Sequence, residues 1–171
     1  MKSDAFQSLL TALGLECTES VIDAAGAGNL LPQNIEHFRQ RLIDSGAEHI
    51  FILTDLDDQA CITLTRERIT ERPNQTIIVA VKEIESWFLA DSETISKLLK
   101  SDFSSETPEA QHNPYDFIKK LMLKRTGAGC GSKVNLANKM TRRGFSVEKA
   151  AQHPHCPSAN YFLTKLQSLR P

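Results

Sequence analysis

Three aspartates follow a short apolar run and could share a metal ion. The run IFILT at 50–54 ends abruptly in Asp55-Leu56-Asp57-Asp58. Carboxylates spaced in this way at the end of a buried strand can bind a hard cation such as Mg²⁺, which prefers oxygen ligands. The alternative is a polar turn in which Asp58 stabilises the N-terminus of the following helix. Taken alone, the pattern is compatible with both interpretations.

A second acidic group follows the next apolar run. TIIVAV at 76–81 leads into Lys82-Glu83-Ile84-Glu85, followed by Ser86 and Trp87. If the two runs are neighbouring parallel strands, both acidic groups lie at the same edge of the sheet, where ligands of α/β proteins bind. Their mutual repulsion then needs a cation or a basic group to offset it. The spacing predicts a metal site shared by the two acidic groups, with neutralisation by Lys82 as the alternative. Trp87 is expected to be a core residue.

The positive charge is concentrated in one stretch. Residues 117–149 hold nine basic residues and one acidic residue, a net charge of +8 in a chain of −1, so the remainder carries −9. Such a division predicts a basic face for a polyanion, such as a nucleic-acid backbone, and a solvated helical surface is the alternative. The candidates for phosphate binding on one side of this stretch are Lys119, Lys124, Lys133, Arg142 and Arg143.

The glycine-rich turn TGAGCGSK at 126–133 is not a P-loop. A P-loop has glycine directly before its lysine and a strand before the turn. Here Ser132 precedes Lys133, and the preceding residues have the periodicity of an amphipathic helix. The turn can still open a helix whose amides, with Lys133, hold a phosphate. A plain connector between two helices is the alternative.

The elements that position these groups follow from hydrophobic periodicity and turn residues. Three segments have strand patterns: the first residues of 20–29, and the whole of 50–54 and 76–81. Helices alternate with them, which predicts an α/β fold with a mainly parallel sheet flanked by helices. The C-terminal part is helical, with a polar loop at 101–113. The expected helices are 4–13, 32–45, one ending at about 72, 92–100, 114–125, 133–143, 146–152 and 158–168.

Size and composition suit one domain. The 171 residues have a mass of 19.1 kDa, with 40% hydrophobic and 24% charged residues, which is typical of a globular protein. We expect a single domain over 1–171, with a sheet part at 1–91 and a helical extension at 92–171. No apolar run approaches the roughly 18 residues of a membrane helix. The N-terminus lacks a signal-peptide pattern, and the four cysteines are scattered, so we expect a cytoplasmic protein with reduced thiols.

The chain resembles a Toprim-like family of uncharacterised bacterial proteins, related in pattern to the Toprim domains of OLD-family nucleases. The resemblance lies in VIDAAGAGNLLPQNIEHFRQRLIDSGAEHIFILTDLDDQ and VAVKEIESWFLAD, and extends weakly to CPSANYFLTKL. Its most specific motifs are TDLDD at 54–58 and EIESW at 83–87. It implies a Toprim fold, a divalent-metal site and phosphodiester chemistry. Asp55 and Asp57 match the metal-binding DxD, Glu85 matches the acid before the tryptophan, and Asp55 and Glu85 are the implied catalytic residues.

The chain departs from that family at its start. The family pattern begins with an apolar strand ending in Glu-Gly, whereas here Ser3-Asp4-Ala5-Phe6 already opens a helix. We therefore expect either that Met1 is not the natural start of a complete domain, or that the catalytic glutamate has been lost. The missing strand would leave a sheet edge open to pairing with another chain, such as a second copy.

Two functions follow from these motifs. The first is a Mg²⁺-binding Toprim-like domain that acts on or binds a nucleic-acid backbone. In its most specific version, this domain is a nuclease of a bacterial defence system. The carboxylates would hold the metal, and the basic helices would position phosphates without reading sequence. The alternative is a non-catalytic interaction module that works with a partner ATPase.

Overall fold

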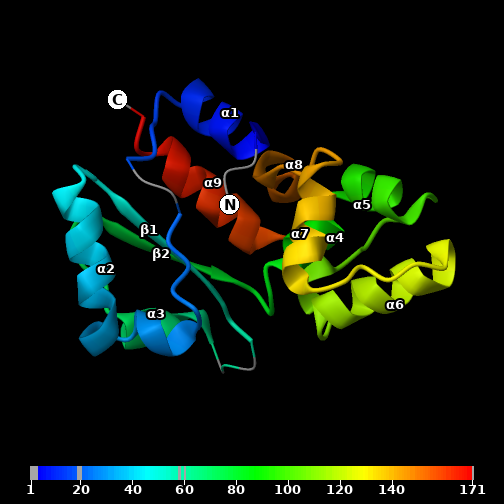
Figure 1. Ribbon diagram of the computed structural model, residues 1–171, viewed down its shortest axis with the longest axis horizontal. Helices are drawn as coiled ribbons and strands as arrows, with labels where there is room; N and C mark the ends of the chain where they lie inside the picture. The colour runs from blue at the N-terminus through cyan, green and yellow to red at the C-terminus, as the bar shows by residue number, and fades with distance from the viewer. Residues whose placement is uncertain (1–3, 19–20, 58, 60, 171) are drawn as a thin grey trace.

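A computed structural model describes residues 4–18, 21–57, 59 and 61–170 of this α/β protein (Figure 1). Two parallel strands lie among helices, and a run of helices follows the second strand. In chain order the elements are α1 (Asp4–Ala12), the 3₁₀ helix η1 (Ala27–Leu30), α2 (Pro32–Asp44), β1 (Ile50–Asp55), α3 (Ile62–Ile69), β2 (Gln75–Ala80), α4 (Glu85–Ala90), α5 (Ser92–Leu99), the 3₁₀ helix η2 (Pro108–Ala110), α6 (Pro114–Thr126), α7 (Lys133–Thr141), α8 (Val147–Ala151) and α9 (Pro157–Gln167).

The two strands end together, as their sequences predicted. β1 and β2 pair in parallel from Ile50 opposite Gln75 to Asp55 opposite Ala80. The pairing continues past the strands, because the amide of Asp57 donates to the carbonyl oxygen of Lys82 at 2.8 Å. The acidic groups that follow β1 and β2 are thereby held at one edge of the sheet.

Alternate residues of β2 face two separate cores. Ile77 and Val79 pack with residues of β1, α2 and α3, whereas Ile78 and Ala80 pack with α1, α4, α8 and α9. Successive side chains of a strand point to opposite faces, so a strand covered on both faces is apolar throughout. Figure 1 shows α2 and α3 on one side of the strands and α1 beside α9 on the other.

The prediction of a strand at the start of 20–29 is wrong. Ser20 lies outside the described residues, and 21–24 form no strand with β1. Asp23 instead accepts a hydrogen bond from the amide of Ala25 at 2.8 Å, the kind of local turn that competes with a sheet ladder. Ala25 and Gly26 then turn the chain with φ values of 54° and 120°. The described sheet therefore has two strands, and Leu53 of β1 is 42% exposed.

Most expected helices are present, with bounds within a few residues of those expected. The third helix, α3, ends at Ile69 rather than near residue 72, because Thr70 adopts a φ of 71°. The loop at 101–113 contains the short helix η2. The sequence does not predict helix α4, because its six residues, Glu and Ser followed by four apolar residues, are all buried and too few to show a helical period.

Trp87 is a core residue, as predicted. It is 1% exposed, and its ring stacks on Phe162 of α9 with centroids 5.8 Å apart. Its indole Nε1 donates to Ser158 Oγ at 2.7 Å, and that hydroxyl donates to Glu109 Oε1 at 2.5 Å. The polar edge of the ring is thus satisfied inside the core, and α4 is tied to α9.

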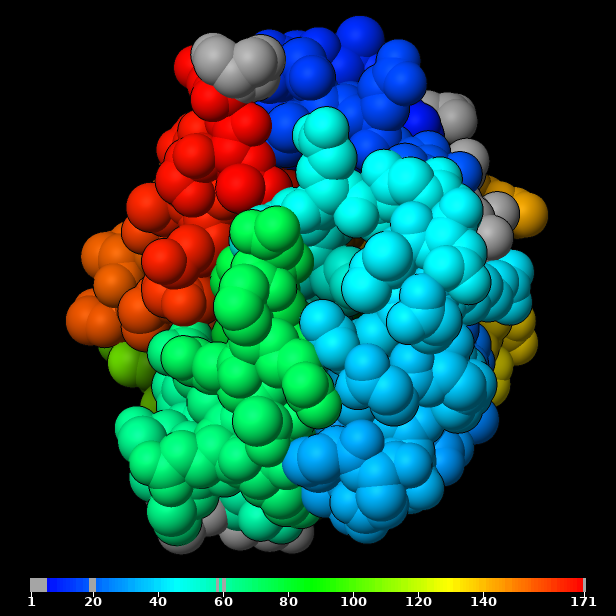
Figure 2. Space-filling view, turned by 90° about the vertical axis from the view of Figure 1, so that its left-hand side faces the viewer, coloured from blue at the N-terminus to red at the C-terminus, as the bar shows by residue number. Residues whose placement is uncertain are grey.

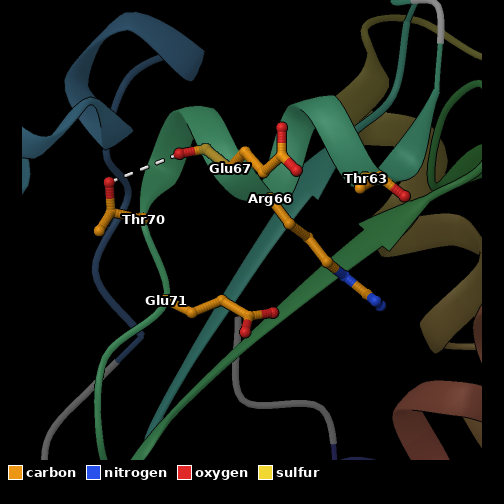
Figure 3. A pocket seen from close by; sticks show the side chains of 5 residues that line it. All are labelled: Thr63, Arg66, Glu67, Thr70 and Glu71. Carbon is orange, nitrogen blue, oxygen red and sulfur yellow. Dashed lines mark hydrogen bonds between the residues drawn. The ribbon is translucent and has the colours of Figure 1, made fainter.

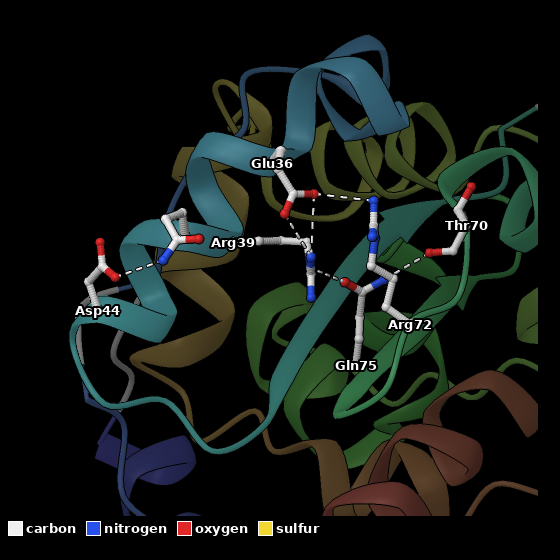
Figure 4. A network of polar contacts seen from close by, with 7 residues as sticks. Glu36, Arg39, Asp44, Thr70, Arg72 and Gln75 are labelled. Atoms are coloured by element: carbon white, nitrogen blue, oxygen red, sulfur yellow. Dashed lines mark hydrogen bonds and ion pairs between the residues drawn. The ribbon is translucent and has the colours of Figure 1, made fainter.

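A polar network joins α2 to the segment that leads into β2 (Figure 4). Arg39 donates to Gln75 Oε1 at 2.8 Å and to Glu36 Oε1 at 3.0 Å, and Arg72 pairs with Glu36 at 3.3 Å. Figure 2 shows that the surface of α2 (light blue) adjoins the green surface of the residues that lead into β2. Arg39 is largely buried, but Glu36 is half exposed, and ion pairs that are open to solvent on one side contribute little energy each.

Within the described residues, no helix has the length and apolar character needed to cross a bilayer.

Candidate functional site

Asp55 anchors the candidate site at the end of β1. Its carboxylate Oδ1 accepts a hydrogen bond from the amide of Ile84 at 2.8 Å, which fixes the turn after β2 against β1. Burial raises the pKa of Asp55, and the Ile84 hydrogen bond and the charge of Lys133 oppose that rise. A carboxylate at this position is partly desolvated and held by one oxygen.

Asp57 and Lys82 face each other with strained backbones. Their φ values are 50° and 62°, in the left-handed region that non-glycine residues seldom adopt. Each such residue costs of order 1 kcal/mol or more, and strain of this kind clusters at functional sites. Asp57 is exposed, and its charge acts to raise the pKa of Asp55. Asp58 lies outside the described residues.

Glu83 links three segments of the site. Its Oε1 pairs with Lys133 Nζ at 2.6 Å, and its Oε2 accepts a hydrogen bond from the amide of Tyr115 at 3.0 Å. Tyr115 is in the first turn of α6, where backbone amides lack helical partners. Glu83 therefore caps α6 and holds the first residue of α7 at the edge of the sheet.

Glu85 is the most buried carboxylate of the group. It begins α4, is 2% exposed, and its Oε2 has no hydrogen-bond partner among the described residues. The nearest cation is Lys133, whose Nζ lies 3.8 Å from that oxygen. Burial raises the pKa of Glu85 to about 7, against an opposing effect of Lys133. An unpartnered buried carboxylate oxygen is costly unless a ligand, proton or ion satisfies it.

Lys133 supplies the positive charge of the site. It is the first residue of α7, after Ser132, whose Oγ caps the helix at the amide of Asn135. Burial lowers the pKa of Lys133, but the hydrogen bond to Glu83 and the charges of Glu85, Glu83 and Asp55 outweigh it and raise the pKa overall. Lys133, rather than Lys82, makes the ion pairs with these carboxylates among the described residues.

Tyr115 shapes the wall beside Lys133. Its hydroxyl donates to the carbonyl oxygen of Gly131 at 2.5 Å, which joins α6 to the turn before α7. The ammonium groups of Lys133 and Lys119 each lie 5.9 Å from its ring centroid. The structure thereby brings two of the predicted phosphate-binding residues to one ring.

The other basic candidates lie elsewhere. Lys124 follows Lys119 by five residues of α6, which places it about 140° further around the helix. Arg142 and Arg143 follow the end of α7, about 13 Å along the helix from Lys133. Arg143 Nη1 donates to the carbonyl oxygen of Lys139 at 2.9 Å. Lys133 pairs with the carboxylates and Lys119 lies beside the ring of Tyr115, whereas none of the other three forms an ion pair with these carboxylates among the described residues.

The residues present fit a divalent cation by their chemistry. Asp55, Glu83 and Glu85 offer carboxylate oxygens, and the unpartnered Oε2 of Glu85 is a ready ligand. Over the described ranges, however, no three acidic, histidine or cysteine side chains already have the arrangement of a metal cluster. Binding an ion would thus require these side chains to move closer together.

Glu83 and Tyr115 were not among the residues selected from the sequence. Glu83 lies within the motif EIESW, but the family resemblance points only to Glu85, the acid before the tryptophan. No sequence pattern points to Tyr115, because its hydrogen-bond partners, Gly131 and Glu83, lie 16 and 32 positions away along the chain. Such long-range pairs depend on how the helices pack.

A surface hollow on α3 is separate from this site (Figure 3). It is lined by Thr63, Arg66, Glu67, Thr70 and Glu71. In Figure 3, Arg66 points away from Glu67 and Glu71, and its guanidinium lies 4.5 Å from the ring centroid of Tyr161. The hollow contains none of the predicted site residues.

Fold and site together define an α/β protein with three carboxylates and one lysine at the carboxyl end of a parallel strand pair. No protein-family model, curated protein or solved structure matches the chain.

Proposed function

We propose that this protein is a Toprim-like domain that binds a divalent cation through its sheet-edge carboxylates and acts on a nucleic-acid phosphate backbone. The observation that carries the proposal is the buried Oε2 of Glu85, which lacks a hydrogen bond and lies in a group with Asp55, Glu83 and Lys133. The resemblance of TDLDD and EIESW to Toprim-like motifs supports the same function.

Asp55 and Glu85 are the residues that would hold the ion, with Asp57 beside them and Glu83 within reach. When bound, Mg²⁺ supplies an activated water and stabilises the leaving oxygen of a phosphodiester. Asp55 keeps its place through the amide of Ile84, and Glu85 is oriented by the first turn of α4. Lys133 and Lys119, near the ring of Tyr115, would hold phosphate oxygens.

The alternative is a non-catalytic module that works with a partner ATPase. One observation favours it: Lys133 already neutralises part of the carboxylate charge without a metal ion. Partial neutralisation by a side chain of the chain itself lowers the repulsion among the carboxylates without a metal ion. The two functions differ in whether the protein cleaves nucleic acid.

A cleavage assay distinguishes them. The wild-type protein is incubated with single- and double-stranded DNA and RNA, with Mg²⁺ or with EDTA. Asp57→Asn removes a charge while retaining a residue type that tolerates the positive φ of 50°. We expect Mg²⁺-dependent cleavage that falls at least tenfold in Asp57→Asn.

The control is Asp44→Asn, at the end of α2 and away from the carboxylates. It should cleave as the wild type does. Cleavage that persists in EDTA, or that is equal in Asp57→Asn, would remove the metal site from the proposal. Binding of nucleic acid without cleavage would favour the alternative.

A further inference from the structure

We propose that Lys133 is an internal counter-ion that competes with the divalent cation for the sheet-edge carboxylates. Its ammonium group and the ion would exclude each other at Glu83 and Glu85. This inference rests on the proposed function and adds a regulatory element to the same site. It follows from the positions of the charges in the structure.

The first support is that Lys133 lies at unequal distances from its two glutamate partners. Lys133 Nζ is 2.6 Å from Glu83 Oε1 but 3.8 Å from Glu85 Oε2, so it forms a hydrogen bond with the first and only a longer ion pair with the second. The Oε2 atom of Glu85 is left without a hydrogen bond. One ammonium group therefore satisfies only part of what three carboxylates offer.

The second support is that the ammonium group of Lys133 already pairs with two of the carboxylates that would bind the cation. Asp55, Glu83 and Glu85 all act on its ammonium group. A divalent ion binds oxygen ligands from several sides, whereas an ammonium group is a singly charged donor of three hydrogen bonds. Bringing both into the same group of carboxylates would place like charges close together, which is unfavourable.

The third support is that Lys133 has a route out of the site. Its side chain is 47% exposed, whereas the side chain of Glu85 is only 3% exposed. It follows the turn of Gly127 to Gly131, where both glycines adopt positive φ values of 72° and 81°. A flexible four-carbon stem at the edge of the site can turn towards solvent without moving the buried carboxylates.

Displacement would change what Lys133 does. Released from Glu83, its ammonium group would be open to solvent on the side of the Tyr115 ring, which Lys119 also contacts. Glu83 would keep its hydrogen bond to the amide of Tyr115 through Oε2, so the cap of α6 would persist. Binding of the cation would thus free the charge of Lys133 to bind a phosphate, so the cation would bind before the phosphate.

The test measures Mn²⁺ binding directly, with Mn²⁺ as a paramagnetic probe whose free concentration is followed by electron paramagnetic resonance. Lys133→Met removes the charge and keeps an unbranched side chain. We expect it to bind Mn²⁺ at least tenfold more tightly than the wild type. Lys133→Arg keeps the charge and should bind no more tightly than the wild type.

The matched control is Lys120→Met, an exposed lysine on α6 that has no ion pair in the described part of the chain. It should bind Mn²⁺ as the wild type does. If Lys133→Met folds poorly without metal, its melting temperature should rise more with added Mn²⁺ than that of the wild type, and this shift provides the same test.

Two results would overturn the inference. If the wild type binds Mn²⁺ and Lys133→Met binds it no more tightly, competition is refuted while the metal site stands. If neither protein binds Mn²⁺, the metal site itself is refuted and the competition with it.

Discussion

Replacement of Trp87 by alanine is expected to lower the free energy of unfolding by about 3–5 kcal/mol, the range for a buried aromatic residue. Trp87 is 1% exposed and stacks on Phe162. The substitution leaves a cavity between α4 and α9 and removes the hydrogen bond to Ser158 Oγ. Equilibrium unfolding in urea, followed by far-UV circular dichroism, measures the loss.

Leu123→Ala is the control for this substitution. Leu123 is on α6 and is 58% exposed, so its truncation should change stability by no more than about 0.5 kcal/mol. A loss of less than about 1 kcal/mol for Trp87→Ala would contradict the packing of α4 against α9.

Glu85→Gln is expected to stabilise the metal-free protein at pH 8 by about 3 kcal/mol and to have little effect at pH 4. Burial raises the pKa of Glu85 from its ordinary value of 4.5 to about 7 in the folded state. The folded protein therefore binds this proton more tightly than the unfolded chain. The stability that the protonated carboxyl contributes is complete below pH 4.5 and is lost as the pH rises through 7.

The neutral amide of glutamine avoids that loss, so the difference between variant and wild type should grow between pH 4.5 and pH 7. Urea unfolding in EDTA across this range measures it. Glu93→Gln is the contrasting control, since hydrogen bonds to Lys149 and Lys97 lower the pKa of exposed Glu93 to about 2. Its effect should have the opposite sign, a loss of stability at neutral pH that disappears in acid. Parallel pH profiles for Glu85→Gln and the wild type would contradict the burial of that carboxylate.

The sequence was sufficient to predict the elements whose residues have a clear local pattern. The apolar, β-branched runs that form β1 and β2 pack into cores on both faces of the strand pair, although Leu53 of β1 is 42% exposed, and this packing explains their apolar character. Amphipathic helices such as α2 and α6 were found for the same kind of reason. These predictions depend on spacing along the chain.

The errors arose where local pattern and tertiary structure disagree. Val21 and Ile22 favour a strand, but the turn made by Asp23, Ala25 and Gly26 leads the chain elsewhere. Helix α4 is six residues long and buried on every side, even at Glu85 and Ser86, so it lacks the exposed polar face by which a helix is recognised.

The candidate site was predicted in part. The positions of Asp55 and Glu85 at one sheet edge followed from the parallel strands. The pairing of Lys133 with Glu83 spans 50 residues and depends on how α7 packs beside the sheet, which no local pattern encodes. Lys133 was expected to meet a phosphate, and in the structure it meets the carboxylates. The Toprim-like resemblance and the phosphate-binding roles stay predictions.

Calorimetric titration of Mg²⁺ into the wild type and Asp55→Asn tests the metal site most directly. The asparagine keeps an oxygen for the amide of Ile84, so the turn after β2 should hold while one negative charge is lost. We expect the wild type to bind Mg²⁺ and Asp55→Asn to bind it at least tenfold more weakly. Equal affinities in the two proteins, or no binding to the wild type, would contradict a divalent-metal site at the carboxyl end of β1 and β2.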